Sequence, residues 1–322
     1  MLGPQDLGQR VVVRRIVGIR GDRPVFSDAL GHLVAIDEMQ VTVQTRSGLV
    51  RVPRTEIVRA KRVPARRRPA GADIAALERA AALAWPAPDT ASLGEWLLRA
   101  ADGWTGRGNS ALPLGDPGRS LSAAIDEVQM WYASRGLPAR INVPLPLAAQ
   151  VDAALDERGW DRSPTTLVQA APLAAVLAGD GGPDLPPVAL AAAPAPDWLA
   201  MVADRKNGLP PAAVHLLTAP PLVTFAAVRA PDGTLLAAAR GAVTLHRLHL
   251  GLVEVAPPAR RRGLARHVVR ALAAWAAGLG EAAAHTAYLQ VPEQNQPAVA
   301  LYARLGFGTH HTYVTRTAPP VS

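Results

Sequence analysis

The chain has 322 residues, 49% of them hydrophobic, which suits two or three domains with sizeable cores better than one small domain. It contains no cysteine, so disulfides, thiolate zinc sites and a cysteine acyl-enzyme are excluded. The net charge of +8 comes from residues 1–70, which hold 14 Arg and Lys against 6 Asp and Glu, whereas residues 71–322 hold 20 of each.

The first 62 residues predict a small β-barrel. Short hydrophobic runs indicate strands, separated by turns at Gly21-Asp22 and Ser47-Gly48. The predicted strands run from Arg10 to Ile19, His32 to Asp37, Gln40 to Arg46 and Gly48 to Val52. The basic charge admits nucleic acid or an acidic protein partner. Because Phe26 is the one aromatic residue in this barrel, it lacks a stacking platform for single strands, which favours protein docking.

Residues 63–72 predict a basic linker, and residues 73–175 a region that resembles the C-terminal part of the chain. The region opens with a helix from Asp73 to Ala84. Both copies then have a Val-Pro pair followed, 15 or 16 residues later, by a Gly-aromatic pair that ends a helix. The pairs are Val143-Pro144 with Gly159-Trp160, and Val291-Pro292 with Gly306-Phe307.

The first copy is not expected to carry chemistry. Four residues before its glycine stands Leu155, where the second copy has Tyr302. It also has Asp116 to Leu121 in place of an arginine-glycine turn. Its polar cluster, Arg107 to Ser110, is either a turn, which we favour, or a group that reaches an acceptor.

Residues 176–196, rich in Ala, Gly and Pro, predict a second linker before a domain at 197–318. This domain is expected to begin with two helices and a hairpin turning at Pro231-Asp232-Gly233. Its predicted elements are helices from Trp198 to Arg205 and Ala212 to Leu217, strands from Leu222 to Arg229, Leu235 to Leu245, His249 to Val255 and Ala287 to Val291, and a helix with Leu264, Val268, Leu272 and Trp275 on one side.

The strand ending in Val253-Glu254-Val255 runs into a turn, Arg260 to Ala265, that opens a helix. A helix start has unpartnered N–H groups and partial positive charge, so such a turn can hold a diphosphate. Gly263 allows close backbone approach, and the arginines can pair with phosphate oxygens. A second motif, from Asn295 to Phe307, opens and closes a short helix.

These two motifs together resemble the GNAT superfamily of acyl-CoA-dependent N-acyltransferases, whose signature is R/Q-x-x-G-x-G/A followed by N-x-x-A-x-x-L-Y-x-x-x-G-F. The resemblance implies an α/β (α+β) GNAT fold, with a mixed central sheet, flanking helices, and a degenerate half before an active one. The barrel resembles the SH3-like domain of actinobacterial proteins labelled histone-acetyltransferase-like or N-acetylglutamate-synthase-like. The residues that it implies for coenzyme binding are Val253, Val255, Arg260, Arg261, Arg262, Gly263, Leu264, Ala265, Arg266 and Asn295.

Tyr302 matches the family's proton donor to the departing thiolate. Strand alternation points Glu254 away from its two valine neighbours, so it is either a general base or amine ligand, or an exposed strand glutamate. Many relatives carry a glutamate where this chain has Gln290, which leaves Glu293 or a water chain as other candidates for the base.

The sequence predicts no metal site, because His246, His249, His310 and His311 have no spacing that gathers three ligands. A clamp for acceptor carboxylates would have to use Arg240 or Arg205.

We therefore expect a cytoplasmic N-acetyltransferase that moves acetyl from acetyl-CoA directly to a small or protein amine. No signal peptide or membrane-spanning run is evident. The alternative is an acyl-CoA sensor without turnover that regulates by binding nucleic acid or protein.

Overall fold

The computed structural model describes residues 2–21, 23–45, 48–62, 69–178, 185–206 and 208–320, in two compact units, Met1–Arg68 and Pro69–Ser322. The helices are α1 Gly71–Ala84, α2 Leu121–Ala133, α3 Ala149–Glu157, α4 Leu173–Leu177, α5 Pro196–Lys206, α6 Pro211–Thr218, α7 Leu264–Ala277 and α8 Gln296–Arg304. The strands are β1 Arg10–Arg20, β2 Arg23–Ile36, β3 Gln40–Thr45, β4 Gly48–Pro53, β5 Ile57–Arg62, β6 Asp89–Leu93, β7 Trp96–Ala100, β8 Arg140–Leu145, β9 Asp161–Arg162, β10 Thr166–Pro172, β11 Val188–Ala191, β12 Val223–Arg229, β13 Leu235–Thr244, β14 Arg247–Val255, β15 Thr286–Pro292 and β16 Gly308–Thr317.

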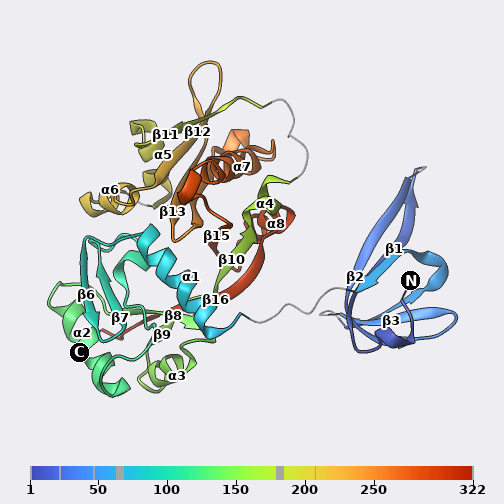
Figure 1. The fold of residues 1–322 in the computed structure, drawn as a ribbon, viewed down its shortest axis with the longest axis horizontal. Helices are drawn as coiled ribbons and strands as arrows, with labels where there is room; N and C mark the ends of the chain where they lie inside the picture. Colours follow the sequence, from blue (N-terminus) through green and yellow to red (C-terminus); the bar gives the residue numbers. More distant parts are fainter. Residues whose placement is uncertain are drawn as a thin grey trace. The chain divides into compact units, whose positions relative to one another are not determined.

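The N-terminal unit is an antiparallel five-stranded sheet in the order β4-β3-β2-β1-β5 (Figure 1). Its buried core is mainly valine, as in Val11, Val13 and Val43. β2 begins at Arg23, well before the expected start at His32. Gly31 lies within this strand, where an added Cβ would lie 1.9 Å from the Gln44 carbonyl oxygen, so the glycine permits close strand approach.

This arrangement fits a small barrel-like domain, while its SH3-like assignment stays a prediction. The expected turn residues Asp22 and Ser47, and the linker residues 63–68, lie outside the described residues.

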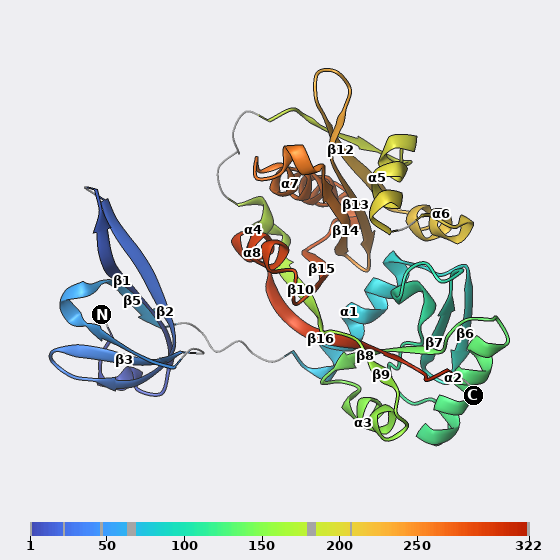
Figure 2. The same cartoon turned by 180° about the vertical axis from the view of Figure 1, so that it is seen from behind.

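The second unit is built on a mixed sheet in the order β11-β12-β13-β14-β15-β10-β16-β8, with β9 beside β16. β14 and β15 are parallel, and the other neighbours are antiparallel. One face of β12 to β15 packs on α4, α7 and α8, and the opposite face on α1, α5 and α6 (Figures 1 and 2). A separate core holds α2, α3, β7 and β8.

The two halves of this unit exchange strands. β10, from the first half, lies between β15 and β16 of the second, and β16 in turn pairs with β8 of the first. β10 and β16, which each come after a Gly-aromatic pair in their own half, are thus antiparallel neighbours. The mixed sheet and flanking helices were predicted, but this pairing was not.

The predicted linker at residues 176–196 needs correction. α4 extends to Leu177, and β11, Val188–Ala191, pairs with β12 as an edge strand. Alanine-rich sequence has low strand propensity and gave little signal for a strand that only sheet pairing stabilises. Residues 179–184 of the predicted linker lie outside the described residues.

Candidate active site

β14 and β15 separate at the centre of the sheet. They pair in parallel from Arg247 with Thr286 to His249 with Tyr288, and the pairing stops there. β14 continues to Val255 on the β13 side alone, with a bulge and a positive φ of 52° at Leu252. Backbone groups of β14 beyond His249 therefore face the gap between the two strands, where an extended ligand can pair with them.

The chain leaves β14 through a tight turn into α7. Gly263 is the N-cap residue, with φ of 91°, a conformation that glycine adopts without strain. No side chain caps this helix, so its first N–H groups point into the turn with the positive end of the helix dipole. Arg261 and Arg262 are exposed beside it. The turn provides what an anion requires: N–H donors and positive charge.

Two other predicted residues belong to α8. Asn295 accepts a hydrogen bond through Oδ1 from the Ala298 N–H at 3.4 Å, so it is the N-cap of this helix. Tyr302 is 7% exposed and packs in the cluster against which Val253 and Val255 lie. The two valines and Tyr302 are thus on one face of the sheet.

Glu254 lies on the opposite face. Its cross-strand partner is Ala238, which is buried in the cluster with α5 and α6. Directly paired residues project to the same side, so Glu254 points away from Val253 and Val255, as alternation predicted. It is half-buried. Among the other candidates, Glu293 is exposed, whereas Gln290 is half-buried and engaged with a histidine.

That histidine is His249, the last β14 residue paired with β15. Its Nε2 lies 3.0 Å from Gln290 Oε1, and with this oxygen as acceptor Nε2 carries the proton. Burial lowers the pKa of His249 to about 3, and nearby Arg240 adds to the effect, so the ring is neutral at pH 7.

A buried polar bridge joins the halves and was missed by sequence reasoning. Glu78 on α1 pairs with Arg107 (Nη2 to Oε2, 2.6 Å) and with His311 on β16 (Nε2 to Oε1, 2.9 Å). Burial opposes ionisation of Glu78, but Arg107 and the His311 hydrogen bond outweigh it and lower its pKa to about 2. The 233 residues between Glu78 and His311 explain why no local pattern showed the pair.

The polar cluster from Arg107 to Ser110 forms a single 3-10 helical turn, Arg107–Asn109, with Ser110 as its C-cap residue. Asn109 Oδ1 accepts hydrogen bonds from the N–H groups of Ala101 and Gly103, at 2.8 and 2.9 Å. Arg107 pairs with Glu78 of the first half and lies over the ring of Tyr313 in the second, 5.6 Å from its centre.

The remaining candidates are dispersed. Arg240 is fully buried, and the Arg205 side chain lies outside what the structure describes. His246 stacks on His285, while His310 contacts His311. Among the described residues, no three His, Asp or Glu side chains gather as a metal site.

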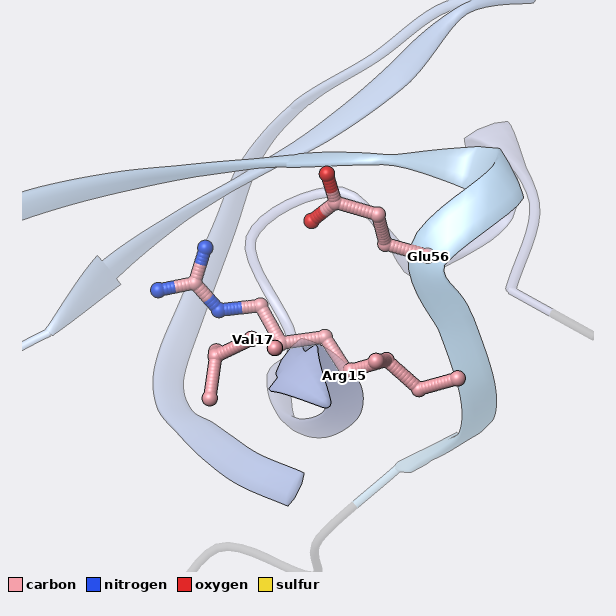
Figure 3. Close-up of a pocket in the computed structure, with 5 residues that line it drawn as sticks. Arg15, Val17 and Glu56 are labelled. Carbon is pink, nitrogen blue, oxygen red and sulfur yellow. The ribbon is translucent and has the colours of Figure 1, made fainter. Parts of the chain in front are cut away.

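The N-terminal unit has a hollow of its own, lined by Arg15, Ile16, Val17, Gly18 and Glu56 (Figure 3). It combines two opposite charges with backbone and aliphatic groups. It offers none of the features of the β14–α7 region, and we assign it no chemistry. Separately, none of the helices in the described ranges is long and apolar enough to span a bilayer.

Comparison with known proteins adds to this geometry. A family model described as "Probable histone acetyltransferase Rv0428c C-terminal" matches residues 71–315. The probable histone acetyltransferase Rv0428c of Mycobacterium tuberculosis is 40% identical over 158 residues, 47% of this chain and 50% of that protein. The uncharacterized N-acetyltransferase YobR of Bacillus subtilis is 28% identical over 258 residues, 76% of this chain and 99% of that protein. The chain thus matches half the length of the mycobacterial relative.

A solved structure, a GCN5-related N-acetyltransferase from Kribbella flavida, has a TM-score of 0.60 at 17% identity and covers 77% of this chain and 96% of that one. At this identity the similarity is one of fold.

Proposed function

Because the chain belongs to the family described as "Probable histone acetyltransferase Rv0428c C-terminal" and is an acyltransferase of GNAT type, we propose that it moves acetyl from acetyl-CoA directly to a primary amine. The observation that carries this proposal is a strand that separates from its neighbour and leads into an uncapped helix start. A direct transfer also suits a chain without cysteine.

In this proposal the turn from Arg260 to Arg266 holds the pyrophosphate. The N–H groups of Leu264, Ala265 and Arg266 donate to it, and the exposed Arg261 and Arg262 add charge. Val253 and Val255 offer backbone groups to the pantetheine arm in the gap between β14 and β15. Asn295, whose Oδ1 caps α8, is proposed to contact the same arm through its amide N–H.

Acetyl-CoA supplies a thioester carbon, to which the amine nitrogen bonds as the carbon–sulfur bond breaks. Tyr302 gives a proton to the departing sulfur from one face of the sheet, and Glu254 receives the proton that the amine loses from the other. Opposed positions suit these two roles, because the acid and the base act on different atoms of one reacting group.

The N-terminal unit is proposed to dock a protein. Ile16, Ile19 and Phe26 on its long hairpin are 36%, 77% and 49% exposed, an apolar surface that suits a protein partner better than a phosphate backbone. A salt-dependent shift of the full chain with random duplex DNA would instead favour nucleic acid.

Release of free thiol from acetyl-CoA with a panel of amines, together with the mass of the product, tests the function. We expect amine-dependent thiol release and a product heavier by one acetyl group. Tight coenzyme binding with no turnover across the panel would support the alternative, an acyl-CoA sensor.

A further inference from the structure

A fully buried arginine lies beside the proposed transfer site, on the face that carries Glu254. Arg240 on β13 is directly paired with Gly251 of β14, just beyond the point where β14 and β15 separate. Its Nε donates to the Leu217 carbonyl at 2.8 Å, and its Nη2 donates to the carbonyls of Ala84 and Leu216 at 3.0 and 3.4 Å. Its Nη1 has no hydrogen-bond partner in the described part of the chain.

This arginine is held in place without a carboxylate. The three carbonyls belong to the ends of α1 and α6, whose negative dipole ends offset part of the charge. Burial lowers the pKa of Arg240 to about 9, and no Asp or Glu among the described residues offsets this effect. Burying a guanidinium with an unpaired N–H costs free energy unless an anion accepts a hydrogen bond from that N–H.

Two indole rings continue the same cluster. Trp85 and Trp104 stack with centroids 5.7 Å apart, and the Arg240 guanidinium carbon lies 5.0 Å from the centre of the Trp85 ring. Each tryptophan is 6% exposed, and each Nε1 is buried without a hydrogen-bond partner among the described residues. An indole N–H can only donate, so both N–H groups lack an acceptor within the described part of the chain.

Beside these three donors, His249 supplies an unpaired acceptor. His249 lies 6.1 Å from Trp85, measured between ring centres, and its Nδ1 has no partner in the described residues. With Nε2 donating to Gln290, Nδ1 is an acceptor for an N–H. A Cβ on Gly251 would lie 3.2 Å from His249 Cε1, so the glycine avoids a close contact with this ring edge.

We propose that Arg240, Trp85, Trp104 and His249 form the acceptor site, and that the acceptor is a small amino acid whose carboxylate the first three bind while His249 accepts a hydrogen bond from its amine. This inference rests on the proposed acetyl transfer. Unpaired donors outnumber the unpaired acceptor, which selects an anion. The half-buried Gly251 and Gln290 border the cluster on the side of the separated strands. A buried, tryptophan-walled site suits a free amino acid better than a chain-borne lysine.

The test measures kcat/KM of the full chain with acetyl-CoA for free amino acids, each compared with its carboxamide and with the amine that lacks the carboxyl group. We expect the free acids to be preferred at least tenfold, about the value of one lost charge-assisted contact. Equal values for acids and carboxamides, or a preference for lysine peptides, would overturn the inference, as would a site filled by water alone.

Two variants locate the effect. Trp104→Phe keeps a ring and removes one N–H, so KM for the acids should rise severalfold while kcat and acetyl-CoA affinity stay unchanged. Arg240→Met should abolish the preference for acids over carboxamides, with its thermal midpoint recorded because Arg240 also holds α1 and α6. Trp131→Phe, a tryptophan of α2 outside the cluster, is the matched control and should change nothing.

A uniform loss for all acceptors in Trp104→Phe would contradict a role in carboxylate recognition. If the unaltered chain does not bind acetyl-CoA, the proposed function itself is refuted. Transfer to acids and carboxamides alike would leave that function standing and remove only this inference.

Discussion

From α2 and α7 onward, the two halves of the second unit both run through helix, strand, helix and a closing strand, but the two helix starts differ. α2 in the first half begins at Ser120, whose Oγ accepts a hydrogen bond from the Ala123 N–H at 3.3 Å. α7 in the second half begins at Gly263 with no side-chain cap. A capped helix satisfies its own donors, whereas an uncapped one keeps them for a ligand. The helix start of the first half is thus satisfied by its own side chain, whereas that of the second half is open to the anion that we propose.

The same contrast holds one helix later. Leu155 on α3 is fully buried in the core of the first half, while Tyr302 on α8 stands at the corresponding place with a hydroxyl. The first half thus keeps the packing of the second without its polar groups. The first half contributes β10, α1 and Glu78 to the contacts that it makes with the second half.

The largest expected effect concerns the buried polar bridge between the halves. Glu78→Gln leaves Arg107 buried without a counter-ion, and we expect a loss of about 3–5 kcal/mol in the free energy of unfolding. Because the folded pKa of Glu78 is lowered to about 2 from 4.5, its stabilisation is present above pH 4.5 and is lost as pH falls toward 2. Urea unfolding across this range measures both.

The control for this prediction is Glu127→Gln, which removes an exposed ion pair with Arg119 and should cost less than about 1 kcal/mol. Equal losses for Glu78 and Glu127 would mean that the halves are not held together by the buried bridge.

The second prediction compares Tyr302 with Leu155, the residue at the corresponding place in the first half. Tyr302→Phe should lower kcat about 100-fold, the lower end for a general acid, and leave acetyl-CoA affinity nearly unchanged. Steady-state kinetics measure it. Leu155→Met, a volume-conserving change at the corresponding core position, should leave kcat as it is. An unchanged kcat in Tyr302→Phe would show that Tyr302 contributes packing and not a proton.

A third variant acts on the helix start. Gly263→Val places a branched residue at φ of 91°, a strain of about 1–3 kcal/mol, and should weaken acetyl-CoA binding at least tenfold. Gly118→Val before α2 is closely matched, with φ of 72° and, as at Gly263, a nearest atom 3.9 Å from the added Cβ. It should cost stability without changing the affinity measured by calorimetry.

The smallest effect is expected at Glu254. Glu254→Gln should lower kcat/KM about tenfold, less than is usual for a general base, because the residue is half-buried and water can replace it. The pH–rate profile should lose its acidic limb. An identical profile in the variant would remove Glu254 as the base.

Sequence reasoning worked where the signal is local. The strand ending at Val255, the turn at Gly263 and the helix opening at Asn295 each depend on a few consecutive residues. It failed where the structure depends on distant pairing. β10 has the hydrophobic pattern of any buried strand, and nothing in that pattern tells whether its neighbours are β15 and β16 or strands of its own half. Arg240 could be named as a candidate acceptor clamp from the sequence, but its carbonyl partners could not be predicted, because they come from two distant helices.

Amide hydrogen exchange with and without acetyl-CoA tests the central claim at the residues concerned. If the start of α7 binds the pyrophosphate, addition of acetyl-CoA slows amide exchange at residues 262–266. The exchange rates at residues 119–123, at the start of α2, stay unchanged. Protection elsewhere with no change at 262–266 would contradict it.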